Sequence, residues 1–250
     1  QNIGAWDVSS VIVMEGMFYD TPFNQDISNW ITSSLVNINY MFKNNTSFNQ
    51  DIGGWNTSQI TSFSGVFRNA SAFNQDIGGW NTSSLTEMIS MFHGASSFNQ
   101  NIGTWDTSSV TNMQSTFDSA SSFDQNIGTW DVSSVIVMEG MFYDTPFNQD
   151  ISNWITSSLV NINYMFKNNT SFNQDIGGWN TSQITSMSEV FYGASAFNQD
   201  LTSWCVTNIA AEPSDLAANS ALTEANKPVW GTCPNGTDGS DAPSIGDGSI

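Results

Sequence analysis

Basic residues are scarce in this sequence: lysine and arginine together number 4, against 23 acidic residues, and the formal net charge is −19. A nucleic-acid backbone needs a basic surface, so this charge argues against nucleic acid as a partner. No apolar run approaches the roughly 20 residues that a membrane helix needs. We therefore expect neither nucleic-acid binding nor membrane insertion of this segment.

Residues that carry catalysis are also few. The chain has one histidine and two cysteines, and it contains no phosphate-binding loop, dinucleotide fingerprint or serine elbow. Pairs of carboxylates occur in any acidic repeat, so they do not indicate glycoside hydrolysis. We expect no enzymatic activity and no resident cofactor.

What the sequence has in abundance is repetition. Tryptophan recurs every 24 or 25 residues from Trp6 to Trp204, in nine units, and two phenylalanine columns keep step with it. Residues 1–62 reappear at 125–186 with one change, Ala5 against Thr129. Such periodicity is typical of stacked repeats that contact mainly their neighbours. We divide the chain into a repeat solenoid (1–204), a C-terminal cap (205–233) and a linker or tail rich in Gly, Ser and Asp (234–250).

Each unit predicts one short helix and one short strand. Val110, Met113 and Phe117 fall at i, i+3 and i+7, a helical spacing, and the preceding serines offer an N-cap. The Phe-Asn-Gln-Asp-Ile element reads as a short strand. The prediction is an α/β fold, a leucine-rich-repeat-like solenoid of nine coils. Each coil would hold one parallel strand and one helix, with the Trp and Phe columns in the core.

The repeat pattern W-[DN]-[TV]-S-S-[VL]-T-x-M-x-x-M-F-x-x-A-x-x-F-N-Q-D-I resembles that of BspA-type leucine-rich-repeat surface proteins. It looks most like the branch with roughly 25-residue "lipoprotein" repeats. The segments WCVTNI, NSALT and PVWGTCP, at 204–209, 219–223 and 228–234, resemble that family's closing region. The resemblance implies a secreted, extracellular or cell-surface protein without enzymatic activity, and a loose association with adhesion.

The two cysteines, Cys205 and Cys233, bracket the region where the repeat fails. We predict a disulfide between them, because a metal pair would lack nearby His or Cys ligands. Closing a loop of this size would stabilise the fold by about 3–4 kcal/mol in the chain-entropy model. A disulfide is also typical of an oxidising, extracellular setting.

One column varies where the core columns are uniform. The residue after the first Phe column reads Tyr19, Lys43, Arg68, His93, Asp118, Tyr143, Lys167, Tyr192. Large side chains with polar tips are typical of recognition surfaces. One interpretation is a solvated face that balances acidic neighbours. The other is a binding stripe for a glycan or a partner protein, formed by Tyr19, Lys43, Arg68, His93, Tyr143, Lys167 and Tyr192.

Two further polar sets invite a functional interpretation. Sequons for possible N-glycosylation occur at Asn44, Asn45, Asn56, Asn69, Asn81, Asn168, Asn169, Asn180 and Asn235. An acidic column offers weak calcium candidates at Asp26, Asp51, Asp76, Asp150, Asp175 and Asp200. Hydrogen bonds from backbone N–H groups are the favoured alternative to calcium for these carboxylates.

Two hypotheses for function follow. In the first, the chain is an extracellular or cell-surface protein that serves adhesion or binding through its solenoid surface. In the second, it is a structural subunit of an extracellular filament. The start at Gln1, inside a unit, suggests a piece of a longer array, and an uncapped start would let one copy stack head to tail on the next. Partners would be a protein or glycan ligand, or copies of the chain itself.

Overall fold

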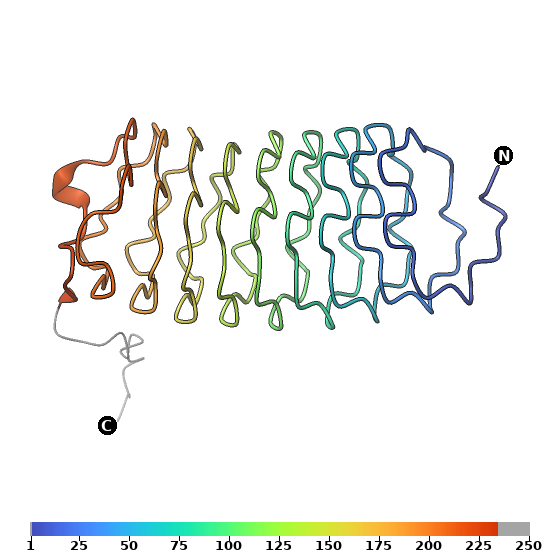
Figure 1. The fold of residues 1–250 in the computed structure, drawn as a ribbon, viewed down its shortest axis with the longest axis horizontal. Coiled ribbons are helices and arrows are strands. Elements are labelled where there is room, and N and C mark those ends of the chain that lie inside the picture. The colour runs from blue at the N-terminus through green and yellow to red at the C-terminus, as the bar shows by residue number, and fades with distance from the viewer. Residues whose placement is uncertain (1, 235–250) are drawn as a thin grey trace, which may run out of the picture.

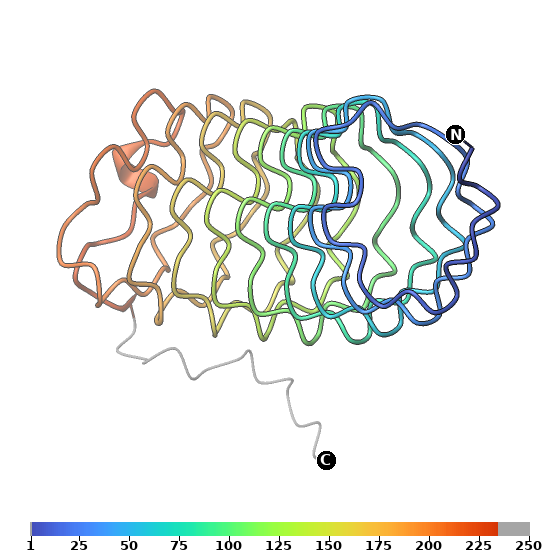
Figure 2. The same ribbon diagram turned by 45° about the vertical axis from the view of Figure 1, so that its right-hand side comes forward.

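The computed structural model describes residues 2–234. The chain winds into coils that follow one another along a single long axis, with the first coil and the region after Trp204 at opposite ends (Figure 1). In the turned view of Figure 2, successive coils repeat a similar path along this axis. Of the predicted tail (234–250), residues 235–250 lie outside the described residues.

The predicted α/β fold is wrong. Regular secondary structure in residues 2–234 comprises the 3-10 helix η1 (Glu224–Asn226) and isolated parallel bridges, with about 2% helix and 3% strand overall. The bridges form one column that includes Glu87, Asn112 and Val137. No coil among the described residues contains the expected helix and strand, so the leucine-rich-repeat-like arrangement is not what this chain adopts.

In the segment predicted as a helix, the backbone N–H groups donate to two kinds of acceptor. The N–H groups of Ser90, Phe92 and Gly94 donate to carbonyls of the next coil at 2.8, 2.8 and 2.7 Å. The intervening N–H groups, such as those of Met91 and Ala95, donate to the carbonyl three residues earlier in their own coil. A helix would direct every N–H to the fourth preceding residue. The apolar spacing of a helix therefore arises here from consecutive turns that also bond to the neighbouring coil.

Two residues per coil hold positive φ angles, four positions apart, and these angles enforce the turns. Ser90 and Gly94 have φ of 53° and 67°. The same pair recurs in every coil: Gly16 and Asp20, Tyr40 and Asn44, Gly65 and Asn69, Ser115 and Ser119, Gly140 and Asp144, Tyr164 and Asn168, Glu189 and Gly193, Asp215 and Asn219. Gly, Asn and Asp tolerate this region best. These columns therefore specify turns in place of a helix.

The core is a set of aromatic stacks, as the Trp and Phe columns predict. Phe92 packs on Phe98 of its own coil with ring centroids 3.9 Å apart and on Phe117 of the next coil at 5.7 Å. Tryptophans of several adjacent coils stack as well; the ring centroids of Trp80 and Trp105, for example, lie 6.4 Å apart. Each indole N–H between Trp30 and Trp204 donates to an isoleucine carbonyl of the preceding coil. Buried tryptophan is thereby satisfied on both its apolar and polar sides.

The Phe-Asn-Gln segment, predicted as a strand, is joined to its neighbours by side chains. The Asn74 Oδ1 accepts hydrogen bonds from the Asn99 N–H at 2.9 Å and from the Gln100 Nε2 at 3.0 Å. Equivalent bonds run along the array, with Asp124 taking the place of asparagine in one coil. An amide ladder therefore replaces the backbone ladder of a parallel sheet.

Residues after Trp204 close the C-terminal end. Phe191 and Gly193 of the last coils donate N–H groups to the carbonyls of Leu216 and Ala218, both at 2.8 Å. Cys205 and Cys233 form the predicted disulfide. At the end of the amide ladder, the Asn198 Oδ1 accepts hydrogen bonds from the Thr223 N–H and from the Nδ2 of Asn226 in η1. The cap thus takes over the bonds that a further coil would make.

The first coil leaves its outer side open. Trp6 is 46% exposed, whereas its duplicate Trp130, covered by the coil before it, is 3% exposed. A hollow lined by Val8, Val11 and Met17, among others, marks the same end. Because residues 1–62 and 125–186 are almost identical, this exposure reflects position in the stack and not a difference in sequence.

Candidate binding surface

The variable column forms a continuous stripe across the coils. Each stripe residue directly precedes the second positive-φ residue of its coil. From Lys43 onward its carbonyl accepts an N–H from the coil before; the Asn69 N–H, for example, donates to the His93 carbonyl at 2.6 Å. The neighbouring Phe column points into the core. Tyr19 is 44% exposed, and the other members are half-buried. The backbone therefore fixes these side chains side by side at the surface.

Lysines of the stripe lie against tyrosine rings. The Lys43 Nζ is 5.2 Å from the ring centroids of both Tyr19 and Tyr40. A cation over an aromatic face is attracted by the ring quadrupole, with a gain of about 0.5–1 kcal/mol at exposed sites. These contacts order the lysine and the tyrosines with respect to one another.

The second cluster is larger. The Lys167 Nζ lies 5.8, 5.3 and 5.0 Å from the rings of Tyr143, Tyr164 and Tyr192, and it forms a salt bridge with Glu189. The hydrogen bond to Glu189 raises the pKa of Lys167, while burial partly opposes this shift. The ammonium group is therefore held by three rings and one carboxylate.

The middle of the stripe has different partners. The His93 Nδ1 lies 3.1 Å from the Asp118 Oδ2. The Nε of Arg68 is buried without a hydrogen-bond partner among the described residues. Arg68 itself lies beside the Lys43 coil, because the Asn44 N–H donates to the Arg68 carbonyl at 2.7 Å.

Sequence reasoning missed three residues of this surface. Tyr40, Tyr164 and Glu189 occupy the first positive-φ column, three residues before the stripe, and each contacts a stripe lysine or its cluster. The only signal was that large residues replace the usual Gly or Ser at these positions. All five tyrosines of the chain therefore belong to the stripe or to this adjoining column.

Comparison with known proteins gives a family for this arrangement. Residues 1–88, 75–146 and 130–229 match the family described as "Mycoplasma protein of unknown function, DUF285". The chain belongs to this family. No curated protein and no solved structure matches this DUF285 chain. Membership agrees with a tandem-repeat protein, and the family description assigns no activity.

The sequons of the DUF285 chain differ in accessibility. Asn45 and Asn169 are buried, and their amides bond to the carbonyls of Phe23 and Phe147 at 2.9 Å. A glycan on either would require the coil to open. Asn56, Asn69 and Asn81 are exposed, whereas Asn44, Asn168 and Asn180 are half-buried. Asn235 lies outside the described residues.

The calcium candidates are engaged with the backbone. The Oδ1 of each Asp in this column accepts the N–H two residues later, as Asp51 does from Gly53 at 2.9 Å. Hydrogen bonds from the Ser or Thr two residues later lower the carboxyl pKa of Asp26, Asp150 and Asp200. The part of the chain that the structure describes contains no group of three His, Cys, Asp or Glu residues arranged to hold a metal.

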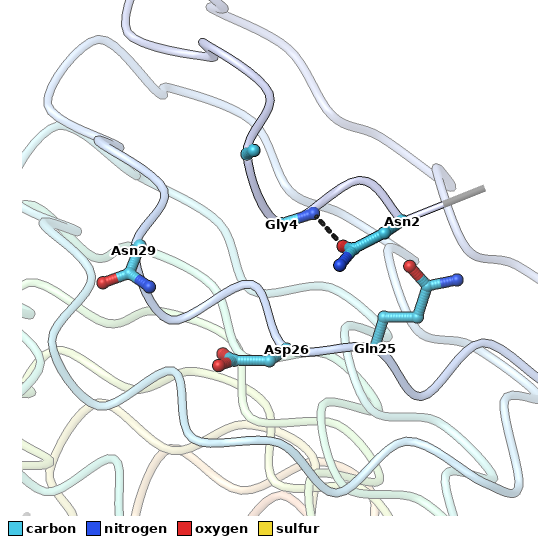
Figure 3. Close-up of a pocket in the computed structure, with 6 residues that line it drawn as sticks. Asn2, Gly4, Gln25, Asp26 and Asn29 are labelled. Carbon is cyan, nitrogen blue, oxygen red and sulfur yellow. Dashed lines mark hydrogen bonds between the residues drawn. The ribbon is translucent and has the colours of Figure 1, made fainter.

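A second hollow lies at the open end between the first two coils. Figure 3 shows Asn2 and Gly4 on one side and Gln25, Asp26 and Asn29 on the other. The Asn2 Oδ1 accepts the Gly4 N–H at 2.9 Å, which is the local turn repeated in every coil. Asp26 is the sole titratable side chain of this lining, so the hollow offers no chemistry beyond that of the repeat.

The described residues contain no helix of the length and apolarity needed to cross a membrane.

Proposed function

We propose that this DUF285 chain is an extracellular or cell-surface protein without enzymatic activity that binds a ligand through the stripe. The observation that carries the proposal is the concentration of unusual side chains there. Three of the four basic residues, the sole histidine and all five tyrosines lie in the stripe or in the adjoining column. The uniform Trp and Phe columns are explained by packing in the core, and this column is not.

The composition of the stripe supports recognition of a surface ligand. Tyrosine presents a large, rigid face and a polar tip at low entropic cost, and Lys or Arg adds directional donors. The disulfide between Cys205 and Cys233 supports an oxidising compartment. The resemblance of the repeat motif to BspA-type surface proteins agrees with the same location. A protein or glycan on an apposed surface is the kind of partner we propose.

Binding to a glycan array and to whole cells tests the proposal. The variant Arg68→Ser, Tyr143→Ser, Lys167→Ser, Tyr192→Ser should lose binding while its unfolding midpoint stays close to that of the wild type. A control variant, Ile31→Ser with Ile155→Ser, removes exposed apolar side chains outside the stripe and should bind as before. Equal binding by the wild type and the stripe variant would refute the proposal.

The alternative of a head-to-tail filament finds less support. Such stacking needs two open ends, and the cap satisfies the donors of the last coils. Pro213 also removes a backbone N–H from the cap. Light scattering should therefore detect no polymer at high protein concentration.

A further inference from the structure

The duplicated blocks give two versions of one surface. Residues 1–62 recur at 125–186, so Tyr19, Tyr40 and Lys43 have duplicates in Tyr143, Tyr164 and Lys167. Both lysines lie 5.2–5.8 Å from the two rings of their own block. The difference between the two surfaces therefore comes from the coil that follows each block.

In the second block the positive charge of the lysine is compensated by a carboxylate. Glu189 forms a salt bridge with Lys167, and Tyr192 adds a third ring 5.0 Å from its Nζ. A charge-assisted hydrogen bond of this kind engages the donors that an anionic ligand would use. This half of the stripe presents tyrosine faces with no net cation.

In the coil that follows the first block, the equivalent positions are Gly65 and Arg68. Gly65 brings no carboxylate, and the Tyr40 ring packs over it: a Cβ on Gly65 would lie 2.5 Å from the Tyr40 Cδ1. Arg68 adds a second cation on the coil beside that of Lys43. Within residues 2–234 neither Lys43 nor Arg68 forms a salt bridge. The exposed Asp20 has its duplicate in Asp144, so it does not account for the difference.

The first block and the coil that follows it therefore carry two cations, on adjacent coils, without a carboxylate partner among the described residues, on a chain of net charge −19. A polyanion would be repelled by the rest of the molecule. A small ligand with one anionic group would feel mainly the local cations, since charges more than about 8 Å away are screened at physiological salt. The planar guanidinium and the ammonium suit a carboxylate or sulfate, and tyrosine faces suit the apolar side of a sugar ring.

We propose that Tyr19, Tyr40, Lys43 and Arg68 form a site for a saccharide that carries a single carboxylate or sulfate. The second block, with Glu189 and Tyr192, discriminates against such an anion. This inference rests on the proposed function and deepens it by naming the ligand class and the residues that select its charge.

Exchanging the two differing residues between blocks tests the site. The probes are 3′-sialyllactose, which carries one carboxylate, and neutral lactose, measured by calorimetry on the full chain. The wild type should bind sialyllactose at one site, on the order of tenfold or more tighter than lactose. Gly65→Glu with Arg68→Tyr should abolish this preference. Glu189→Gly with Tyr192→Arg should create a second site of similar preference.

The duplication supplies the folding control, because each exchange places residues that already stand at the equivalent positions after the other block. In Gly65→Glu the Tyr40 ring must move away from the new Cβ, and Tyr164 shows that a tyrosine is accommodated beside a glutamate there. Retention of the charge preference in Gly65→Glu, Arg68→Tyr would overturn the inference. So would equal affinity for both sugars, or tighter binding of heparin or polyglutamate than of sialyllactose. If the wild type binds neither sugar but still binds cells through the stripe, the inference fails and the proposed function stands. If the stripe variant binds cells as the wild type does, the proposed function fails.

Discussion

Gly94→Ala distinguishes the turn-built coil from a helix by the sign of its effect. Gly94 has φ of 67°, and its N–H donates to Asp118 of the next coil at 2.7 Å. An L-residue in this region costs about 1–2 kcal/mol. The new Cβ would also lie 2.3 Å from the Asn69 Oδ1, so the Asn69 amide must move from its 2.9 Å bond with Asn44, at a cost of about 1 kcal/mol. We expect Gly94→Ala to lower the free energy of unfolding by about 2–3 kcal/mol.

In a helix the same substitution would stabilise by about 0.8–1 kcal/mol. Urea unfolding followed by tryptophan fluorescence measures the difference as a shift of midpoint. Gly79→Ala is the matched control: no atom lies within 4 Å of the position that its new methyl group would occupy and its φ is not positive, so it should be neutral or slightly stabilising. Gly94→Asn should cost less than Gly94→Ala, since asparagine adopts the same conformation at Asn44 and Asn168. A higher midpoint for Gly94→Ala would refute the turn assignment.

Four other perturbations have defined outcomes. Replacing Cys205 and Cys233 by serine should lower the free energy of unfolding by about 3–4 kcal/mol in the chain-entropy model, measured by urea unfolding; no change would exclude a stabilising disulfide. Acid should destabilise the fold below about pH 4, because hydrogen bonds hold several Asp pKa values below their usual value and this stability is lost as those groups protonate in the folded state. Changing the affected residues to Asn, which forms the same turn at Asn56 and Asn81, should weaken the pH dependence of melting; these residues are Asp7, Asp26, Asp106, Asp131, Asp150 and Asp200. Fusing a copy of residues 100–124 ahead of residue 1 should bury Trp6 as Trp130 is buried, with a higher unfolding midpoint and a blue-shifted fluorescence, and an unchanged midpoint would contradict the stacking account.

The sequence predicts correctly which side chains of the repeat are buried, but not the pattern of backbone hydrogen bonds. The Trp and Phe columns identify the core because nine units in step leave little other use for buried aromatics. The predicted Cys205–Cys233 disulfide is confirmed by the structure, and it could be predicted because no further His or Cys ligands stand near these cysteines in the sequence. The helix prediction is wrong because apolar residues at i, i+3 and i+7 also suit consecutive turns on one face of a coil.

The sequence signal for turns lies in the two columns that bear positive φ angles. Of their 18 residues, all except Tyr40, Tyr164 and Glu189 are Gly, Asn, Asp or Ser, a composition typical of turns. The strand prediction fails for a related reason: the Asn and Gln side chains of the Phe-Asn-Gln segment take the bonds that a backbone ladder would need. The spacing of the apolar residues therefore does not predict either the turn hydrogen bonds between coils or the Asn and Gln side-chain bonds.

The candidate site too could be predicted from the sequence only in part. Its varying column was visible in the sequence because core columns do not vary. The three residues that complete the clusters were not, because their contacts with Lys43 and Lys167 depend on the turn that places them three residues earlier on the same surface. The charge difference between the two surfaces depends on the salt bridge between Lys167 and Glu189, which joins residues 22 positions apart on adjacent coils.

Fluorine NMR of the 3-fluorotyrosine-labelled protein tests the central claim most directly, because all five tyrosines lie on the candidate surface. Single Tyr→Phe variants assign the five resonances. Addition of 3′-sialyllactose should shift the signals of Tyr19 and Tyr40 and leave those of Tyr143, Tyr164 and Tyr192 in place. The account would be contradicted if the saccharide bound and no tyrosine resonance moved.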